Sequence, residues 1–270
     1  MGETSPTAWQ PFTPRGVAAF AAAPLRRLLL VQLIVAFLVA LGVAWFCYDR
    51  YVPVITSAVE KLPAEGRIRQ QRLEWPGNSP VVLAENQFLC LTVDLERTGQ
   101  LRSVAHLQFD FCRSKVVIHS ILGYAEVTYP KGWVIAANRE ELQPLWGAWR
   151  PALLVALMAV VILCLLVSWF GLALAYELPL SLLGFFLNRQ LDRGSGWRLG
   201  GAALLPGALL MLAGISFYDL GALDLVGLAF VFVAHLVAGW VYLVLGLLAL
   251  PRVKTETGTS KNPFAARKQK

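Results

Sequence analysis

The sequence predicts a mainly α-helical membrane protein with four transmembrane helices and a small α+β domain inserted between the first two. Its 270 residues are 57% hydrophobic and 15% charged, whereas about a quarter of the residues of a typical soluble domain are charged. Several apolar runs reach the roughly 20 residues that a helix needs to cross the hydrocarbon core of a bilayer. Between the first two runs, the composition returns to that of a soluble domain. These observations indicate one folded domain attached to a set of membrane-spanning helices.

The chain is predicted to begin with a cytoplasmic tail, residues 1–27, followed by a transmembrane helix over residues 28–48. Prolines in the tail oppose a long helix, and Arg26 and Arg27 stand directly before the apolar run. Basic residues before such a run are also typical of a secretory signal peptide. This run is longer than the apolar part of a signal peptide and lacks a clear small-residue cleavage site near its end. We therefore expect an uncleaved anchor.

Residues 49–148 are predicted to form an extracytoplasmic α+β domain, a small antiparallel sheet with a helix packed on it. The helix is expected over residues 54–62, because apolar residues recur at helical spacing and Pro63 ends the segment. Polar and apolar residues alternate over residues 88–95 and 105–112, as in strands with one buried face. Turn-forming glycines and prolines separate three further predicted strands, residues 115–122, 124–129 and 132–136.

A second transmembrane helix is predicted over residues 151–172. Asn138, with Glu141 three residues later, is typical of a capping box at the start of a helix leading into this span. The next residues, 173–198, include Glu177 and a proline, and their apolar part is short for a separate span. Leucines recur there at helical spacing beside polar residues, which favours an interfacial helix and a cytoplasmic loop.

The third and fourth transmembrane helices are predicted over residues 199–217 and 225–250, and residues 251–270 form a basic cytoplasmic tail. With four spans, the basic residues of both tails and of the loop before the third span lie on one side, which the positive-inside rule makes cytoplasmic. A fifth span over residues 172–187 would place the basic tail outside, against that rule. The sheet domain is then extracytoplasmic. The predicted topology anchors are Arg26, Arg27, Arg189, Arg193, Arg252 and Lys254.

Cys90 and Cys112 form a possible disulfide, because extracytoplasmic domains lie in an oxidising compartment. If the predicted strands pair with Thr92 opposite Asp110, the two cysteines face each other on the same side of the sheet. A shift of one residue sends side chains to opposite faces. Two separate buried thiols therefore stay open as the alternative.

Four polar residues on or near the same strands, Asp94, His106, Asp110 and His119, could in combination hold a metal ion. Zinc sites usually contain pairs of Cys or His ligands two to four residues apart, and this sequence has no two Cys or His residues at such a spacing. We therefore expect solvated polar groups on an exposed sheet face, without a metal or cofactor. The HExxH, GxSxG, Walker and GxGxxG motifs are also missing from the sequence, and we expect no enzymatic activity.

Within the predicted spans, His235, Glu177 and Gln32 are the candidate polar site. An ionisable group near the middle of a span is a functional candidate. The alternative is a neutral His235 that is hydrogen-bonded across a helix interface, to Gln32 or Ser216. Two acids near the start of the fourth span, Asp219 and Asp224, lack the GxGD sequence of intramembrane aspartyl proteases, so we expect a turn with solvated acids.

Small residues four positions apart predict close packing of the third and fourth transmembrane helices. Ala203 and Gly207 form such a pair on the third helix, and Ala234 and Ala238 form one on the fourth. Small side chains let two helix backbones approach closely within a membrane. We expect these positions to have a structural role.

Two short motifs and the order of segments carry a resemblance. An LPxxGxI sequence (Leu62, Pro63, Gly66, Ile68) opens the predicted domain, and residues 92–99 read TVDLERTG, a strand followed by a turn. With one anchor before the domain and three spans after it, the chain resembles uncharacterised bacterial membrane proteins of the type found beside maltodextrin-utilisation genes. The resemblance implies a multi-pass protein of the bacterial inner membrane, and it brings no established catalytic residues.

We expect a non-enzymatic accessory, sensing or assembly role, in which the extracytoplasmic domain is presented to a ligand or partner protein. The expected partners are the lipid bilayer and another membrane or extracytoplasmic protein, and a homo-oligomer is compatible with the sequence. Nucleic acid is not expected, because the basic residues lie mainly beside the apolar runs. The alternative is a transporter component that uses His235 and Glu177, although a transporter usually needs several polar residues near the middle of the membrane.

Overall fold

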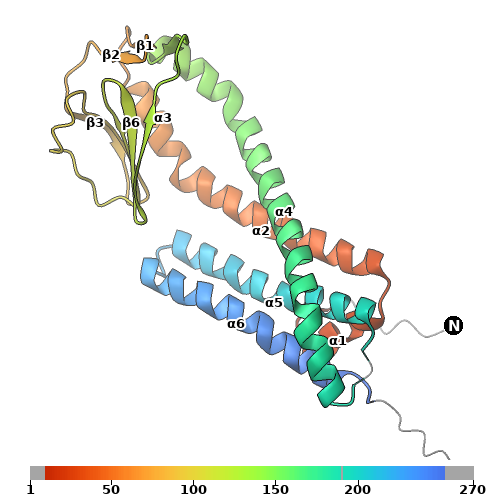
Figure 1. The fold of residues 1–270 in the computed structure, drawn as a ribbon. Helices are drawn as coiled ribbons and strands as arrows, with labels where there is room; N and C mark the ends of the chain where they lie inside the picture. The colour runs from red at the N-terminus through yellow and green to blue at the C-terminus, as the bar shows by residue number, and fades with distance from the viewer. Residues whose placement is uncertain (1–9, 190, 253–270) are drawn as a thin grey trace, which may run out of the picture. The chain divides into compact units, whose positions relative to one another are not determined.

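The computed structural model describes residues 10–189 and 191–252, and most of them are helical. Four helices among these residues are long and apolar enough to cross a membrane (Figure 1), which agrees with the four that the sequence predicts. The long helices are α2 (Leu25–Arg50), α4 (Arg139–Phe186), α5 (Arg193–Asp219) and α6 (Leu225–Ala249). The short helices are α1 (Pro14–Ala22) and α3 (Val52–Glu60).

Side-chain caps fix where two of these helices begin. Thr13 Oγ1 accepts a hydrogen bond of 3.0 Å from the backbone N–H of Gly16 at the start of α1. At the start of α4, Asn138 Oδ1 accepts from the backbone N–H of Glu141 at 2.9 Å, and Asn138 Nδ2 donates to Glu141 Oε1 at 3.0 Å. Such caps satisfy N–H groups that the helix itself leaves unpaired. The predicted helix start at Asn138 is confirmed.

Helix α4 continues without a break from Arg139 to Phe186. The predicted boundary between residues 172 and 173 is therefore not the end of a helix. Pro179 removes only one backbone hydrogen bond, and the residues on both sides of it are good helix formers such as Ala and Leu. One proline in this context is tolerated within the helix.

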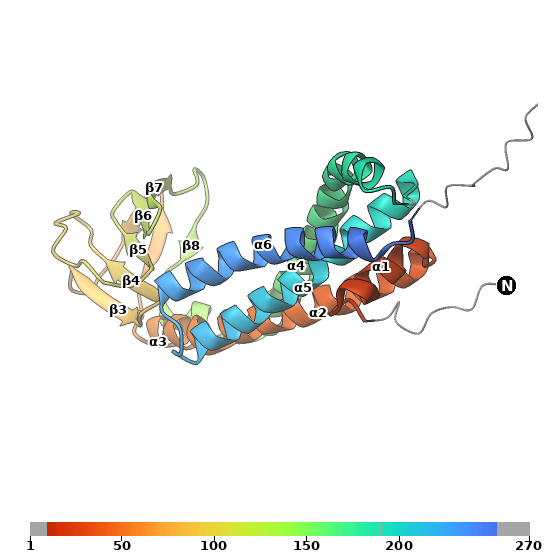
Figure 2. The same cartoon turned by 90° about the horizontal axis from the view of Figure 1, so that it is seen from below.

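Eight strands follow α3 and precede α4 in the chain, in two sheets. The three-stranded sheet has the order β2-β1-β8. The five-stranded sheet has the order β3-β4-β5-β6-β7, and its strands are labelled in Figure 2. The sequence predicted β4 to β8 and missed the first three strands, of which β1 and β2 are very short. The strands are β1 (Arg67–Arg69), β2 (Arg72–Glu74), β3 (Val81–Glu85), β4 (Leu89–Val93), β5 (Leu107–Phe111), β6 (Lys115–Ser120), β7 (Gly123–Thr128) and β8 (Ile135–Ala136).

Strands β4 and β5 run parallel, whereas the other pairs of neighbours are antiparallel. The prediction of an antiparallel sheet is wrong at this pair. Parallel neighbours need a connection of about a dozen residues or more, and residues 94–106 supply one. We call these residues the crossover segment, and they return the chain to the end of the sheet from which β4 started.

The hydrophobic core of the sheet domain lies between α3 and the five-stranded sheet. Val54 and Ala58 of α3 share one buried cluster with Leu89 and Val93 of β4, and each is at most 5% exposed. Full burial of a Val or Leu side chain contributes roughly 1.5–3 kcal/mol. Alternate strand residues face this core, as the period-two pattern predicts.

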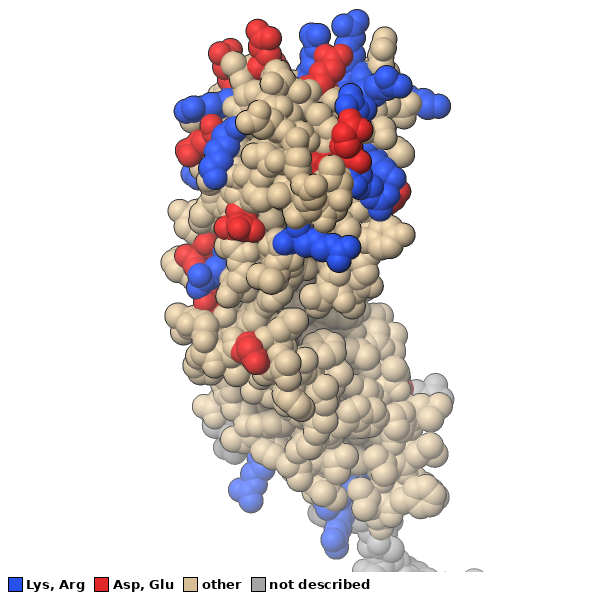
Figure 3. Space-filling model, turned by 90° about the vertical axis from the view of Figure 1, so that its left-hand side faces the viewer, with Lys and Arg blue, Asp and Glu red and all other residues tan. Residues whose placement is uncertain are grey.

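Charged side chains are unevenly distributed over the molecule. On the face drawn in Figure 3, Lys, Arg, Asp and Glu gather over the strands, and the helical surface is almost entirely uncharged. Helices α2 and α6 expose many large apolar side chains, among them Leu38, Phe230 and Trp240. An exposed apolar surface of this extent suits helices that face lipid rather than water.

The described chain divides into two compact units. The sheet unit comprises residues 35–165 and 210–232, with both sheets, α3 and parts of all four long helices. The helical unit comprises the described residues of 1–34, 166–209 and 233–270.

Helices α5 and α6 come very close within the helical unit. A Cβ atom placed on Gly207 would lie 2.6 Å from the backbone carbonyl oxygen of His235. On the other helix, a Cβ on Gly239 would lie 4.0 Å from the carbonyl oxygen of Ala203. The predicted close packing at Ala203 and Gly207 is confirmed, and on α6 a glycine takes part in it.

Candidate functional site

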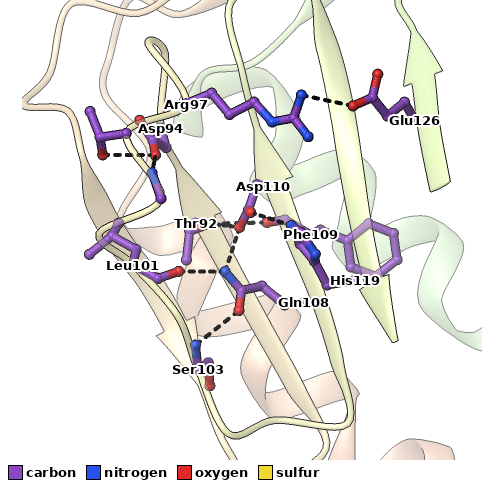
Figure 4. A network of polar contacts seen from close by, with 12 residues as sticks. Thr92, Asp94, Arg97, Leu101, Ser103, Gln108, Phe109, Asp110, His119 and Glu126 are labelled. Atoms are coloured by element: carbon purple, nitrogen blue, oxygen red, sulfur yellow. Dashed lines mark hydrogen bonds and ion pairs between the residues drawn. The ribbon is translucent and has the colours of Figure 1, made fainter. Parts of the chain in front are cut away.

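Polar side chains lie on the sheet face opposite the core, beneath the crossover segment (Figure 4). Thr92 is fully buried and Gln108 is 5% exposed. The prediction of solvated groups concerns Asp94, His106, Asp110 and His119, and it is wrong for Asp94, which is 5% exposed. The reason is the parallel pairing, since the chain must cross the sheet between β4 and β5 and does so over this face.

One β5 residue, Gln108, fastens the crossover segment to the sheet. Gln108 Nε2 donates to the carbonyl oxygen of Leu101 at 2.7 Å, and Gln108 Oε1 accepts from the backbone N–H of Ser103 at 3.0 Å. Gln108 Nε2 also lies 2.6 Å from Asp110 Oδ1, which accepts a further hydrogen bond from the Thr92 hydroxyl. The network gives these buried polar groups the partners that burial requires.

Ion pairs extend the network towards strands β6 and β7. His119 Nε2 lies 3.0 Å from Asp110 Oδ2, and Arg97 Nη1 lies 2.9 Å from Glu126 Oε1. Glu126 also accepts from Lys115 Nζ at 2.6 Å. This hydrogen bond, followed by the positive charges of Lys115 and Arg97, lowers the pKa of the Glu126 carboxyl. Exposed charge pairs are weakened by solvent, so these contacts orient side chains more than they stabilise the fold.

Asp94 organises the turn that begins the crossover segment. Its Oδ2 atom accepts hydrogen bonds from Thr98 Oγ1 at 3.0 Å and from the backbone N–H of Gly99 at 3.1 Å. Gly99 has φ +68°, a left-handed conformation that glycine adopts without strain. Burial acts to raise the pKa of the Asp94 carboxyl, but the hydrogen bonds from the turn outweigh it and lower that pKa. The other oxygen, Oδ1, is buried and has no hydrogen-bond partner in the described part of the chain.

A groove of about 560 Å³ opens between the crossover segment and the sheet. Its lining includes the acids Asp94 and Asp110, the basic residues Arg97 and Arg102, and the ring of Tyr124. Pockets that bind small molecules usually have volumes of about 300–1,000 Å³ and a few converging polar groups. The groove therefore has the size and chemistry to hold a small polar ligand.

The two cysteines of the sheet domain are both free and both buried. The predicted register occurs, with Thr92 opposite Asp110, but the strands are parallel and Cys90 lies opposite Gln108. Cys112 is thus displaced from Cys90 by four residues along the strands, or roughly 13 Å. A disulfide needs Cα atoms within about 7 Å. Because β4 and β5 are parallel, Cys90 and Cys112 do not face each other as the possible disulfide requires.

The structure brings together only part of the set considered as metal ligands. Asp110 and His119 lie within hydrogen-bonding distance of each other, and Asp94 lines the same groove. His106 lies elsewhere in the sheet unit, where its Nδ1 atom is 2.9 Å from the hydroxyl of Tyr218. Within the described ranges, no group of three or more His, Cys, Asp or Glu side chains is arranged to hold a metal ion.

The candidate intramembrane residues have separate surroundings. Gln32 is 4% exposed, and its Nε2 atom donates to the carbonyl oxygen of Gly201 at 3.3 Å. Glu177 is half-buried, and its carbonyl oxygen accepts from Ser181 Oγ. No hydrogen bond joins Gln32 to Glu177 in the described helices. The His235 side chain is half-buried, and its backbone lies against Gly207.

Arginines of the loop before α5 and of its first turns cap helix ends. Arg198 Nε and Nη2 donate to the carbonyl oxygen of Ala21, at 2.9 and 2.6 Å, in the last turn of α1. Arg189 Nη1 donates to the carbonyl oxygen of Leu250, directly after α6, at 2.5 Å. These carbonyls have no partner within their own helices. Arg189 thus has a structural role in addition to its predicted role in topology.

The structure describes the side chains of three other predicted topology anchors. Arg26 and Arg252 are exposed, and Arg27 is half-buried. The side chain of Arg193 and all of Lys254 lie outside the described residues.

Sequence reasoning missed an ion pair that ties two long helices together in the sheet unit. Arg50 at the end of α2 has its Nε atom 2.8 Å from Asp219 Oδ1 at the end of α5. Asp219 is 7% exposed, so the expectation of a solvated acid is wrong there. The carbonyl oxygen of Arg50 accepts from Asn86 Nδ2 at 2.7 Å. The available signal was an arginine directly after one apolar run and an acid directly after another, 169 positions later.

No protein-family model, curated protein or solved structure matches this chain.

Proposed function

We propose that this protein crosses a bacterial inner membrane four times and presents its sheet domain on the extracytoplasmic side as a ligand-recognising surface. Its role is non-enzymatic, as an accessory, sensing or assembly subunit, and the site of recognition is the groove beneath the crossover segment. The observation that carries this proposal is a groove of about 560 Å³ lined by charged groups of both signs.

The distribution of polar groups supports this assignment. The polar side chains with free surface belong mainly to the sheet domain, and the surface of the long helices is mostly apolar (Figure 3). Gln32, one of the few polar residues in the spans, donates a hydrogen bond to the carbonyl oxygen of Gly201. A folded outer domain carried by apolar helices suits recognition at the membrane surface better than passage of a polar solute through it.

The test compares wild-type protein with a variant whose groove is filled. Leu101→Trp enlarges a lining side chain and leaves the backbone carbonyl that binds Gln108 in place. Each protein, purified in lipid nanodiscs, is incubated with a cell extract and washed, and the small molecules released on heating are identified by mass spectrometry. We expect the wild type to release at least one compound that the variant does not retain.

Arg69→Trp is the matched control, because Arg69 is an exposed residue of β1 outside the groove lining. It should retain the same compounds as the wild type. The proposal fails if the wild type retains nothing specific, or if Leu101→Trp retains the same compounds.

A further inference from the structure

A second groove, of about 520 Å³, lies between α3 and the start of α4 in the sheet unit. Ile55 and Val59 line it from α3, and Leu145, Trp149 and Leu153 line it from α4. The described residues of its lining are all aliphatic or aromatic. We call it the α3–α4 groove. Because its described lining carries no charged group, it suits an apolar ligand, unlike the groove beneath the crossover segment.

A hydrogen bond holds the two sides of the α3–α4 groove together. Trp146 Nε1, on α4, donates to Thr56 Oγ1, on α3, at 3.0 Å. The Thr56 hydroxyl donates in turn to the carbonyl oxygen of Val52 at 2.8 Å. The indole N–H therefore has a partner, and Trp146 contributes the apolar part of its ring to the groove lining. The groove is formed before any ligand binds, as is usual for sites that bind small molecules.

The apolar face that lines the groove continues along α4 into the predicted span over residues 151–172. Leu145, Trp149 and Leu153 recur at helical spacing, and Val160 and Leu163 continue the same face. Each of these five side chains is more than half exposed. An exposed apolar face on a helix of this length suits contact with lipid chains. The α3–α4 groove is thus continuous with the surface that the span presents to lipid.

The groove also extends past the end of the predicted span. Its lining on α4 begins at Leu142, which is 11 positions before Leu153, or about 16 Å along the helix axis. Trp146 and Trp149 lie in this outer part, and tryptophan is enriched where a bilayer meets water. The hydrocarbon core of the bilayer covers only the residues of the span itself. An acyl chain that enters the groove would remove the outer apolar side chains from water, which is favourable.

We propose that the α3–α4 groove binds one acyl chain of a phospholipid from the leaflet on the side of the sheet domain. The chain lies along Leu153, Trp149 and Leu145. A helix from a second copy, about 10 Å wide, would need roughly 1,250 Å³ over the same length, which is more than twice the volume of the groove. An acyl chain is thin enough to enter. The inference rests on the membrane crossing in the proposed function and assigns a second site, separate from the groove beneath the crossover segment.

Native mass spectrometry of the full-length protein, ejected from phosphatidylglycerol nanodiscs, tests this proposal. As the collision energy rises, loosely attached lipids leave first and a lipid held in a groove leaves last. We expect the wild type to keep one phospholipid after the others are lost. Leu145→Trp, which fills the groove, should lower the lipid-bound fraction at least fivefold. A wild type that loses its last lipid together with the others, or that appears as a lipid-free dimer, would overturn the proposal.

Leu163→Trp is the matched control, because Leu163 is an exposed leucine on the same face of α4 and lies outside the groove lining. It should keep one phospholipid as the wild type does. Equal retention by Leu145→Trp and Leu163→Trp would contradict the assignment to the groove. If Leu145→Trp does not fold, Val59→Trp fills the groove from α3 and is measured in its place.

The two proposals fail in different ways, since Leu145 does not line the groove beneath the crossover segment. If the wild type keeps no phospholipid but releases a compound that Leu101→Trp does not retain, the lipid assignment alone is wrong. If Leu145→Trp loses the phospholipid of the wild type while the wild type retains no extract compound, the recognition proposal alone is wrong.

Discussion

The thiols of Cys90 and Cys112 lie in the layer between the sheet and the crossover segment, where burial controls their chemistry. Cys90 is fully buried and Cys112 is 3% exposed. Burial raises the pKa of the Cys90 thiol to about 11 and also raises that of Cys112. The thiolate is the reactive form of cysteine, so both residues are expected to be inert in the folded domain.

Alkylation by iodoacetamide tests this expectation in a protein with Cys47→Ala and Cys164→Ala. At pH 8.5 an ordinary thiol is about half ionised, whereas a pKa of about 11 leaves roughly 0.3% of Cys90 as thiolate. We expect modification in the native state to be more than about a hundredfold slower than in denatured protein. Rapid native-state modification, or a mobility shift on reduction that reveals a disulfide, would contradict the structure.

The same shift predicts how pH affects stability. The folded-state pKa of Cys90 is raised above its unfolded value of about 8.5. Its contribution to stability is therefore fully present below about pH 8.5 and is lost as the pH rises towards about 11.

The Asp94 carboxyl has the opposite effect on the pH dependence of stability, because its folded-state pKa is lowered. Its contribution to stability is present above the unfolded pKa of about 3.9 and is lost as the pH falls below that value.

At the scale of elements, the contact between α5 and α6 depends on the absence of a side chain at Gly207. A Cβ atom there would lie 2.6 Å from a backbone carbonyl oxygen, and a backbone atom cannot move aside as a flexible side chain can. The two helices would have to separate to accommodate an added methyl group.

We expect Gly207→Ala to destabilise the protein by about 1–3 kcal/mol, the usual cost of overpacking. Thermal unfolding in detergent, followed by circular dichroism, measures the effect. Gly171→Ala is the matched control, because Gly171 also lies in a long helix and a Cβ there would meet open space. The control should unfold at or above the wild-type temperature, since alanine is the better helix former. Equal unfolding temperatures for Gly207→Ala and the wild type would contradict the close approach.

At the scale of the whole molecule, the four-span proposal predicts which segments face each side of the membrane. Lys131 lies in the loop between β7 and β8 and is exposed, as is Arg252 after α6. In spheroplasts, a membrane-impermeant maleimide should label Lys131→Cys, but it should label Arg252→Cys only after lysis. Cys47→Ala and Cys164→Ala in both proteins remove the background. Labelling of both sites in intact spheroplasts would contradict the proposal that three spans, an odd number, separate Lys131 from Arg252.

The sequence by itself determined the long helices and much of the sheet domain. Their signals are local. The length of the apolar runs predicts α2, α5 and α6, and period-two alternation predicts β4 and β5, because the spacing of apolar residues within an element shows which of its faces is buried. The cap at Asn138 was predictable for the same reason.

Only the tertiary structure decided how these elements combine. The direction of β5 depends on the path of residues 94–106, and no local pattern encodes it. That direction buried Thr92 and Gln108, separated Cys90 from Cys112 and created the groove. The partners of Arg50 and Arg198 are likewise far away in sequence. Long-range pairing depends on the energy of the assembled fold, and for this reason the candidate site became visible only in three dimensions.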